Sequence, residues 1–144
     1  MKKYLPHAVI CDVDGTVALR GDRDPYGYSK VHLDLPNEPI IEVVKLLVSD
    51  YRDLLFVSGR ERSCFPATQA WLRKNLDNTD FEFVPAFMRA TGDNRKDAVV
   101  KREIYEKHIK DNYQVDYVLD DRNQVVEMWR SLGLVCLQVA NGDF

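Results

Sequence analysis

The chain has 144 residues, of which 45% are hydrophobic and 30% charged, and its formal net charge is −3. This length predicts one domain with a sizeable core, and the net charge excludes a general attraction of the whole surface to polyanions. No apolar run has transmembrane length and no signal-peptide pattern is present, so we expect a cytoplasmic protein without membrane contacts. Three cysteines without CxxC spacing predict free thiols, as in a reducing compartment.

Strand and helix patterns alternate along the chain. The predicted strands are apolar runs at about 8–13, 54–58, 81–87, 115–119 and 134–139. The predicted helices cover about 38–51, 66–76, 95–110 and a last segment that ends at Leu132. We therefore expect an α/β fold with a five-stranded, mainly parallel sheet and helices on both faces. The polar connection 15–36 is typical of a functional loop, and no large cap domain is predicted.

Two carboxylates follow the first strand, one residue apart. Asp12 and Asp14 share a face, because side chains two residues apart on a strand point to the same side. Two like charges this close are costly unless a cation or a shared proton relieves them. Gly15 permits an abrupt turn, and Thr16 adds a hydroxyl beside the carboxylates. The pattern predicts a site for Mg²⁺ and for an anionic group such as phosphate, although a pair that merely ends a strand is the alternative interpretation.

Polar side chains also follow later strands. Ser58-Gly59-Arg60 comes at the end of the second strand and Asp120-Asp121-Arg122 at the end of the fourth. Because ligands of open parallel sheets bind at the carboxyl ends of the strands, we expect these segments to gather near Asp12. Lys96 begins the predicted long helix, where a cation opposes the helix dipole unless a phosphate binds there.

Each of these segments also has a purely structural interpretation. Ser58-Gly59-Arg60 is compatible with an ordinary turn, and one of Asp120 and Asp121 with a helix cap. Lys96 is compatible with the solvated face of a charged helix. Together, however, they supply acids for a metal and donors for an oxyanion, and no single structural role accounts for that combination.

The segments Asp12-Val13-Asp14-Gly15-Thr16, Ser58-Gly59-Arg60, Lys96 and Asp120-Asp121 resemble, in order, the four motifs of the haloacid dehalogenase superfamily. The resemblance is closer to the phosphatase domains of the polynucleotide kinase–phosphatases of T-even bacteriophages, and it covers nearly the whole chain. Residues 120–130 and 138–144 carry it most specifically. It implies a haloacid-dehalogenase-like Rossmannoid fold and a Mg²⁺-dependent phosphatase that heals DNA or RNA ends. The expected substrates are 3′-phosphates, with 2′,3′-cyclic phosphates as a further class, and a phage-encoded protein would act in the host cytoplasm.

The resemblance also implies roles for these residues. Asp12 would attack phosphorus and form an aspartyl-phosphate, and Asp14 would protonate the leaving oxygen and then deprotonate the water. The implied metal ligands are Asp12, the carbonyl of Asp14, and one or both of Asp120 and Asp121. The implied phosphate- and substrate-binding residues are Thr16, Arg23, Ser58, Gly59, Arg60, Lys96 and Arg122.

The Walker A pattern GxxxxGK[ST] does not occur in the 144 residues, so no kinase activity is expected. Residues 1–144 are therefore predicted to be a single phosphatase domain, either a stand-alone protein or part of a larger one. The alternatives are a small-molecule phosphomonoesterase of the same superfamily and a catalytically idle module that binds nucleic-acid ends. Single-stranded or nicked DNA or RNA 3′ ends are the expected partners, and self-association is expected by analogy only.

Overall fold

The computed structural model describes residues 3–48, 51–76 and 85–144. Within them a five-stranded sheet has the order β5-β4-β1-β6-β7, and all of its neighbouring strands are parallel. These strands are β1 (His7–Cys11), β4 (Arg52–Glu61), β5 (Ala86–Arg89), β6 (Gln114–Asp120) and β7 (Cys136–Gln138). The predicted α/β fold with a parallel sheet is confirmed.

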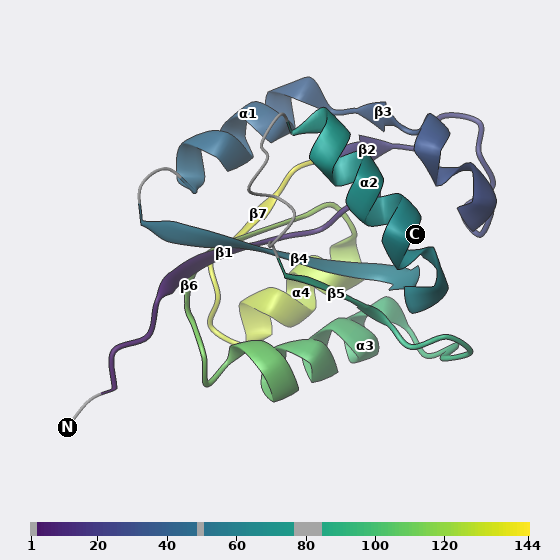
Figure 1. The fold of residues 1–144 in the computed structure, drawn as a ribbon. Helices are drawn as coiled ribbons and strands as arrows, with labels where there is room; N and C mark the ends of the chain where they lie inside the picture. Colours follow the sequence, from purple (N-terminus) through teal and green to yellow (C-terminus); the bar gives the residue numbers. More distant parts are fainter. Residues whose placement is uncertain (1–2, 49–50, 77–84) are drawn as a thin grey trace.

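Four α-helices of the described residues cover the two faces of this sheet (Figure 1). They are α1 (Glu38–Leu47), α2 (Phe65–Asn75), α3 (Asp97–Ile104) and α4 (Asn123–Ser131). Helices α1 and α2 lie over one face, and α3 and α4 lie over the other. The predicted helix 95–110 corresponds to α3 followed by the π-helical turn η4 (Tyr105–Ile109), so the helix type changes within one continuous segment.

The first strand contributes side chains to two separate hydrophobic clusters. Val9 and Cys11 pack in the cluster that includes α1 and α2, whereas Ala8 and Ile10 pack in the cluster that includes α3 and α4. Successive side chains of a strand point to opposite faces, so this alternation follows from the β conformation. A strand that is buried on both faces is apolar at nearly every position, which explains why the run before Asp12 has no polar residue.

The five strands differ in their bounds from the predicted ones, and two of the differences matter for the site. Strand β4 does not end before Gly59 but continues to Glu61, which pairs with Arg89 of β5 beyond an irregularity in the register. The predicted strand 81–87 falls mostly on residues 77–84, which lie outside the described residues. Strand β5 occupies the edge of the sheet, as the nearby Pro85 indicates.

The long connection after β1 contains more regular structure than a loop. Strands β2 (Ala18–Leu19) and β3 (Leu35–Pro36) pair in an antiparallel two-stranded sheet, and the 3₁₀ helix η1 (Tyr28–Leu33) lies between them. This part of the chain lies at the end of the molecule toward which β4 and β5 point (Figure 1). The connection therefore stands beside the carboxyl ends of the main sheet.

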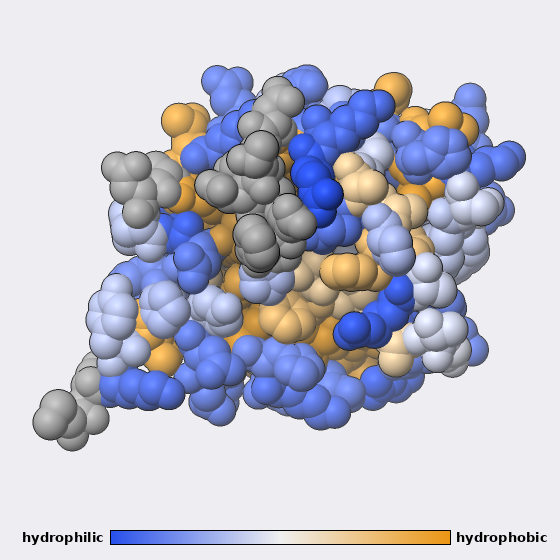
Figure 2. Space-filling view, viewed as in Figure 1, coloured by the Kyte–Doolittle hydropathy of each residue, from blue (hydrophilic) through white to orange (hydrophobic). Residues whose placement is uncertain are grey.

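The face of the molecule seen in Figure 2 has a central apolar area within a hydrophilic surround. Apolar and weakly polar residues gather between α2 and α3, and hydrophilic residues surround them (Figure 2). In the described parts of the chain, no helix has both the length and the apolar character that crossing a membrane requires.

Candidate active site

The carboxyl ends of β1, β4 and β6 open into a cavity of about 960 Å³. The predicted site residues that line it are Asp12, Asp14, Arg23, Gly59, Arg60, Lys96, Asp120, Asp121 and Arg122. Thr16 and Ser58 are buried behind this lining, with exposed fractions of 0% and 2%. The fold thus brings together segments that are more than a hundred residues apart in the sequence.

Three carboxylates form a buried acidic cluster at the bottom of the cavity. One oxygen from each of Asp12, Asp120 and Asp121 lies within 4.8 Å of the others. Burial raises the pKa of Asp12 well above its usual range, and the charge of Asp120 raises it further. Burial likewise raises the pKa of Asp121. Positive charge nearby is therefore needed to keep all three buried carboxyl groups ionised.

Lys101 supplies part of that charge. Its Nζ donates to Oδ1 of Asp12 at 2.8 Å and to Oδ2 of Asp120 at 2.9 Å, and its side chain is 2% exposed. Burial alone would lower the pKa of Lys101, but the charges of Asp12 and Asp120 raise it above its ordinary value. We did not single out Lys101 from the sequence. The available signal was a lysine on the buried stripe of α3, between Val100 and Ile104.

The donor set of this cluster fits a magnesium ion. Three carboxylates and one ammonium leave two uncompensated negative charges, which matches a divalent cation. Carboxylate oxygens are the ligands that Mg²⁺ prefers. The turn after β1 packs closely on the cluster, since a Cβ on Gly15 would lie 2.2 Å from Oδ2 of Asp121. The residues that would hold the ion are Asp12, Asp120 and Asp121.

A second cluster of charges surrounds Asp14. Arg60 donates two hydrogen bonds to the Asp14 carboxylate, from Nε to Oδ2 at 3.0 Å and from Nη2 to Oδ1 at 2.7 Å. Arg60 and Arg23 both also donate to Asp34, at 2.8 and 2.7 Å. Two arginines and two aspartates balance in charge, and such forked pairs fix geometry as well as charge. The side chain of Asp34 has no exposed surface, whereas that of Asp14 is 39% exposed and reaches the cavity.

This arrangement changes the interpretation of the two arginines. The guanidinium groups of Arg23 and Arg60 are directed at aspartates, with side chains 4% and 1% exposed. The hydrogen bonds that both arginines donate to Asp14 hold its carboxylate in place. Asp34 is a further residue that sequence reasoning missed, because it lies in the polar connection 15–36 at no distinctive spacing from the motifs.

The end of β4 packs tightly against the start of α3. Ser58 Oγ accepts a hydrogen bond from the backbone N–H of Arg60 at 3.1 Å. A Cβ on Gly59 would lie 2.6 Å from Oδ1 of Asp97, so a larger residue there would displace that carboxylate. Arg89 joins the same elements, since its Nε donates to the carbonyl of Gly59 at 2.8 Å and its Nη2 pairs with Asp97. The loop that carries Lys96 is therefore fastened to β4.

Lys96 and Arg122 are the predicted cations on the rim of the cavity. Lys96 is exposed and immediately precedes the first residue of α3. Arg122 pairs with Asp97 at 2.9 Å, and its Nε donates to the carbonyl of Phe144 at 2.7 Å. The lysine in contact with Asp12 is Lys101, and contact of Lys96 with phosphate stays a prediction.

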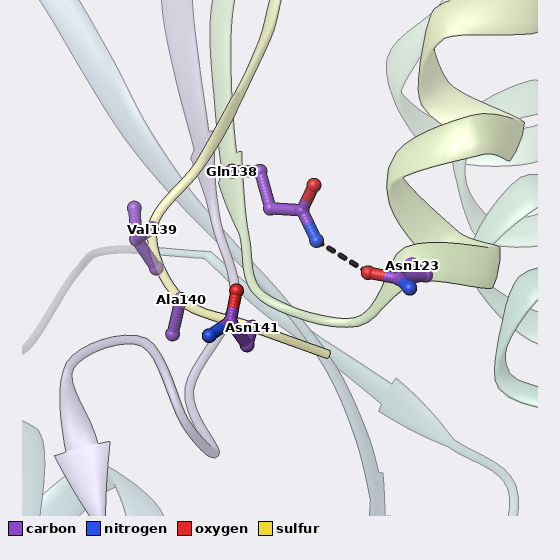
Figure 3. A pocket seen from close by; sticks show the side chains of 5 residues that line it. All are labelled: Asn123, Gln138, Val139, Ala140 and Asn141. Atoms are coloured by element: carbon purple, nitrogen blue, oxygen red, sulfur yellow. Dashed lines mark hydrogen bonds between the residues drawn. The ribbon is translucent and has the colours of Figure 1, made fainter. Parts of the chain in front are cut away.

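A second cavity of about 410 Å³ lies between the end of β7 and the start of α4 (Figure 3). It is lined by Asn123, Gln138, Val139, Ala140 and Asn141. Gln138 Nε2 donates to Oδ1 of Asn123 at 2.6 Å, and it also donates to the backbone carbonyl of Asp121 at 3.1 Å. The end of β7 thereby supports the segment that bears Asp120 and Asp121.

Comparison with known proteins agrees with this architecture. A bifunctional polynucleotide kinase/RNA ligase, named as putative, from Autographa californica nuclear polyhedrosis virus is 36% identical over 129 residues, which are 88% of this chain and 18% of the viral protein. A chain in the structure of a Pnkp1/Rnl/Hen1 complex is 42% identical, with a TM-score of 0.91 over 99% of this chain and 49% of that one. A class C acid phosphatase from Bacillus anthracis with bound tungstate shares the fold, at 14% identity and a TM-score of 0.62, over 96% of this chain and 68% of that one.

The chain thus spans less than half of the length of the viral relative and of the matched chain in the Pnkp1/Rnl/Hen1 complex. Residues 6–144 match the family described as the polynucleotide kinase PNKP phosphatase domain. That match covers nearly all of the chain, including every residue of the two charged clusters. The chain belongs to the phosphatase domains of the polynucleotide kinase PNKP family, which are phosphatases of the haloacid dehalogenase type.

Proposed function

We propose that this chain is a Mg²⁺-dependent polynucleotide 3′-phosphatase that uses Asp12 as its nucleophile. The observation that carries the proposal is the position of Asp12, which belongs to the acidic cluster, contacts Lys101 and lines the cavity. The relatives' names, a polynucleotide kinase/RNA ligase and a Pnkp1 RNA repair complex, support nucleic-acid ends as the substrate class. The 2′,3′-cyclic phosphates are a further proposed substrate.

The proposed reaction consists of two displacements at phosphorus. A carboxylate oxygen of Asp12 forms a bond to phosphorus while the bond from phosphorus to the 3′-oxygen breaks, and Asp14 donates a proton to that leaving oxygen. Water then attacks the aspartyl-phosphate, Asp14 accepts a proton from the water, and phosphate is released with Asp12 restored. A bound Mg²⁺ would supply charge neutralisation between the carboxylate and the phosphoryl oxygens.

Neighbouring side chains prepare both aspartates for this reaction. Lys101 holds one oxygen of Asp12, and Thr16 Oγ1 donates to the other at 3.2 Å, which fixes the plane of the carboxylate. The positive charge of Lys101 also reduces the repulsion between the nucleophile and an anionic phosphate. Arg60 positions Asp14 through its two hydrogen bonds. Aspartates held in fixed positions relative to the substrate lower the entropic part of the activation barrier.

The rim of the cavity is proposed to hold the substrate. Lys96 and Arg122 supply cations, and we propose that they contact the terminal phosphate or the phosphate that precedes it. The predicted contacts of Ser58 and Gly59 with the phosphoryl oxygens stay proposals. The hydroxyl of Thr16 donates to Asp12, and we propose that it orients that carboxylate. The carbonyl of Asp14 is proposed as a further metal ligand, and self-association stays a prediction.

The test is phosphate release from a 3′-phosphorylated oligonucleotide, with Mg²⁺ and with excess chelator. We expect release with Mg²⁺ only, and none from the Asp12→Asn variant, because an amide is not a nucleophile. Asp53→Asn, an exposed aspartate at the start of β4, is the matched control and should behave like the wild type.

Two results would contradict the proposal. Turnover by Asp12→Asn near the wild-type rate would exclude the covalent mechanism. Faster hydrolysis of nucleoside monophosphates or sugar phosphates than of the oligonucleotide would favour a small-molecule phosphomonoesterase instead. A 5′-phosphorylated oligonucleotide serves as the control for end specificity.

A further inference from the structure

Two aromatic rings stand exposed in the lining of the active-site cavity. Tyr26 is 81% exposed and Phe144 is 67% exposed, and both line the cavity that contains Asp12. The two tryptophans, by contrast, are 4% and 0% exposed and belong to the hydrophobic clusters. Large apolar rings that remain in water beside a reaction centre are candidates for ligand contacts.

Phe144 is held in place by a residue of the site itself. The guanidinium of Arg122 lies 5.0 Å from the centre of the Phe144 ring, and its Nε donates to the Phe144 carbonyl at 2.7 Å. Gly142 packs so closely that a Cβ there would lie 1.9 Å from the carbonyl of Asp121. The ring therefore has a fixed base next to the acidic cluster while much of its surface faces solvent.

The turn that carries Tyr26 is held by the charged cluster around Asp14. Its backbone N–H donates to Oδ1 of Asp24 at 2.8 Å, which closes a tight turn. Arg23 Nη1 donates to the carbonyls of Asp24 and Pro25, at 3.2 and 3.5 Å. Because Arg23 also holds Asp14, the same side chain connects the turn under Tyr26 to the reaction centre.

Cations line the same cavity as these rings. The exposed side chains of Arg20 and Lys96 line the same cavity, and so does Arg122. A groove that combines aromatic rings with basic residues is the arrangement by which proteins bind single-stranded nucleic acids, since bases stack on the rings while phosphates meet the cations. Stacking requires no particular base, because every base has an aromatic face.

We propose that Tyr26 and Phe144 are the stacking positions for the nucleobases next to the 3′-terminal phosphate. The inference rests on the proposed function and adds to it a reason for preferring an oligonucleotide over a small phosphate ester. It makes the two aromatic residues determinants of substrate binding, distinct from the aspartates that carry out the chemistry.

The test compares two substrates in each variant. One is a short 3′-phosphorylated oligothymidylate, and the other is the same chain with abasic residues at its two 3′-terminal positions. In the wild type, kcat/KM should be higher for the oligothymidylate. In Phe144→Ala and in Tyr26→Ala the ratio of the two kcat/KM values should fall about tenfold, mainly through KM, since loss of one stacking ring costs about this much.

Two kinds of variant control for indirect effects. Phe144→Ala keeps the backbone carbonyl that accepts a hydrogen bond from Arg122, so this contact is not lost with the ring. Phe144→Tyr and Tyr26→Phe keep an aromatic ring, and both should retain the wild-type ratio of the two kcat/KM values. Tyr4→Ala removes a ring that is also 81% exposed but does not line the cavity, and it should leave the ratio unchanged.

The outcomes separate this inference from the proposed function. If the wild type hydrolyses the oligothymidylate but neither alanine variant changes the ratio, the stacking proposal is wrong and the proposed function stands. If the alanine variants lose activity equally on both substrates, the rings have a structural role and the stacking proposal is again wrong. If the wild type releases no phosphate from either oligonucleotide, the proposed function itself fails and the stacking proposal fails with it.

Discussion

At the scale of single residues, the position of Lys101 explains how two aspartates share the bottom of the cavity. Asp12 and Asp120 are 5% and 1% exposed, and the ammonium of Lys101 lies between them. A buried charge is tolerated only where it is paired and hydrogen-bonded. Lys101 therefore stabilises the two buried carboxylates, and we expect it to contribute to the proposed chemistry as well.

The two lysines of this region make a direct comparison. Lys101→Met should lower kcat on a 3′-phosphorylated oligonucleotide by about 100-fold or more, because a donor beside the reacting groups is lost. It should also lower the free energy of unfolding by about 3 kcal/mol, since it leaves two buried carboxylates without their partner. Steady-state kinetics and urea unfolding measure the two effects.

Lys96→Met is the matched variant for this comparison, because Lys96 is exposed and lines the rim. It should raise KM and leave kcat and the free energy of unfolding close to the wild-type values. A large loss of kcat in Lys96→Met together with normal turnover in Lys101→Met would reverse the roles proposed for the two lysines.

At the scale of elements, the turn after β1 determines the shape of the acidic cluster. Gly15 has φ of +78°, a conformation that other residues rarely adopt, and it packs on the Asp121 carboxylate. Gly15→Ala should therefore displace Asp121 and raise the Mg²⁺ concentration for half-maximal activity by about tenfold or more, if each lost ligand contact is worth about 1.4 kcal/mol. A Mg²⁺ titration of phosphate release measures it.

Gly21→Ala provides the control for backbone strain. Gly21 also has a positive φ, +58°, but a Cβ there would meet nothing within 4 Å. The two variants share the conformational cost of about 1 kcal/mol and differ in the contact with Asp121. An equal change of the Mg²⁺ requirement in both would show that strain, and not displacement of Asp121, is responsible.

At the scale of the whole molecule, a third charged cluster lies at the opposite end of the sheet. Asp116 accepts hydrogen bonds from Arg52 Nε and from His7 Nδ1, both at 2.8 Å. This cluster joins the starts of β1, β4 and β6, whereas the reaction centre joins their carboxyl ends. We therefore expect variants of Asp116 to change stability and to leave activity unchanged.

This cluster makes stability depend on pH in a defined direction. Burial by itself would raise the pKa of Asp116, but the hydrogen bonds from Arg52 and His7 lower it below the usual value near 4. Because the pKa is lower in the folded state, the charged Asp116 stabilises the fold above about pH 4, and this contribution is lost as the pH falls through the folded-state pKa.

The corresponding variant is Asp116→Asn. Urea unfolding at pH 7 should show a loss of about 1 kcal/mol relative to the wild type, and the difference should shrink below about pH 3. Asp53→Asn, exposed at the same end of the sheet, should show no such pH dependence. A difference for Asp116→Asn that stays constant from pH 7 to pH 2.5 would exclude the proposed role of its charge.

The sequence by itself determined the fold class and the edge of the sheet at which Asp12 meets Asp120 and Asp121. Apolar runs that end in Asp12 and in Asp120 are typical of buried parallel strands, and the carboxyl ends of such strands meet at one edge of the sheet. These features follow from the local pattern of apolar and polar residues, which can be read from the sequence alone.

Only the tertiary structure decided which side chains touch. Lys101 is separated from Asp12 by 89 residues and Asp34 from Arg60 by 26, and no local pattern connects such partners. The extension of β4 through Gly59 likewise depends on Arg89 and Asp97, which lie on other elements. Charge pairing inside a cavity is set by the three-dimensional approach of helices and strands, so it becomes visible only when they are packed together.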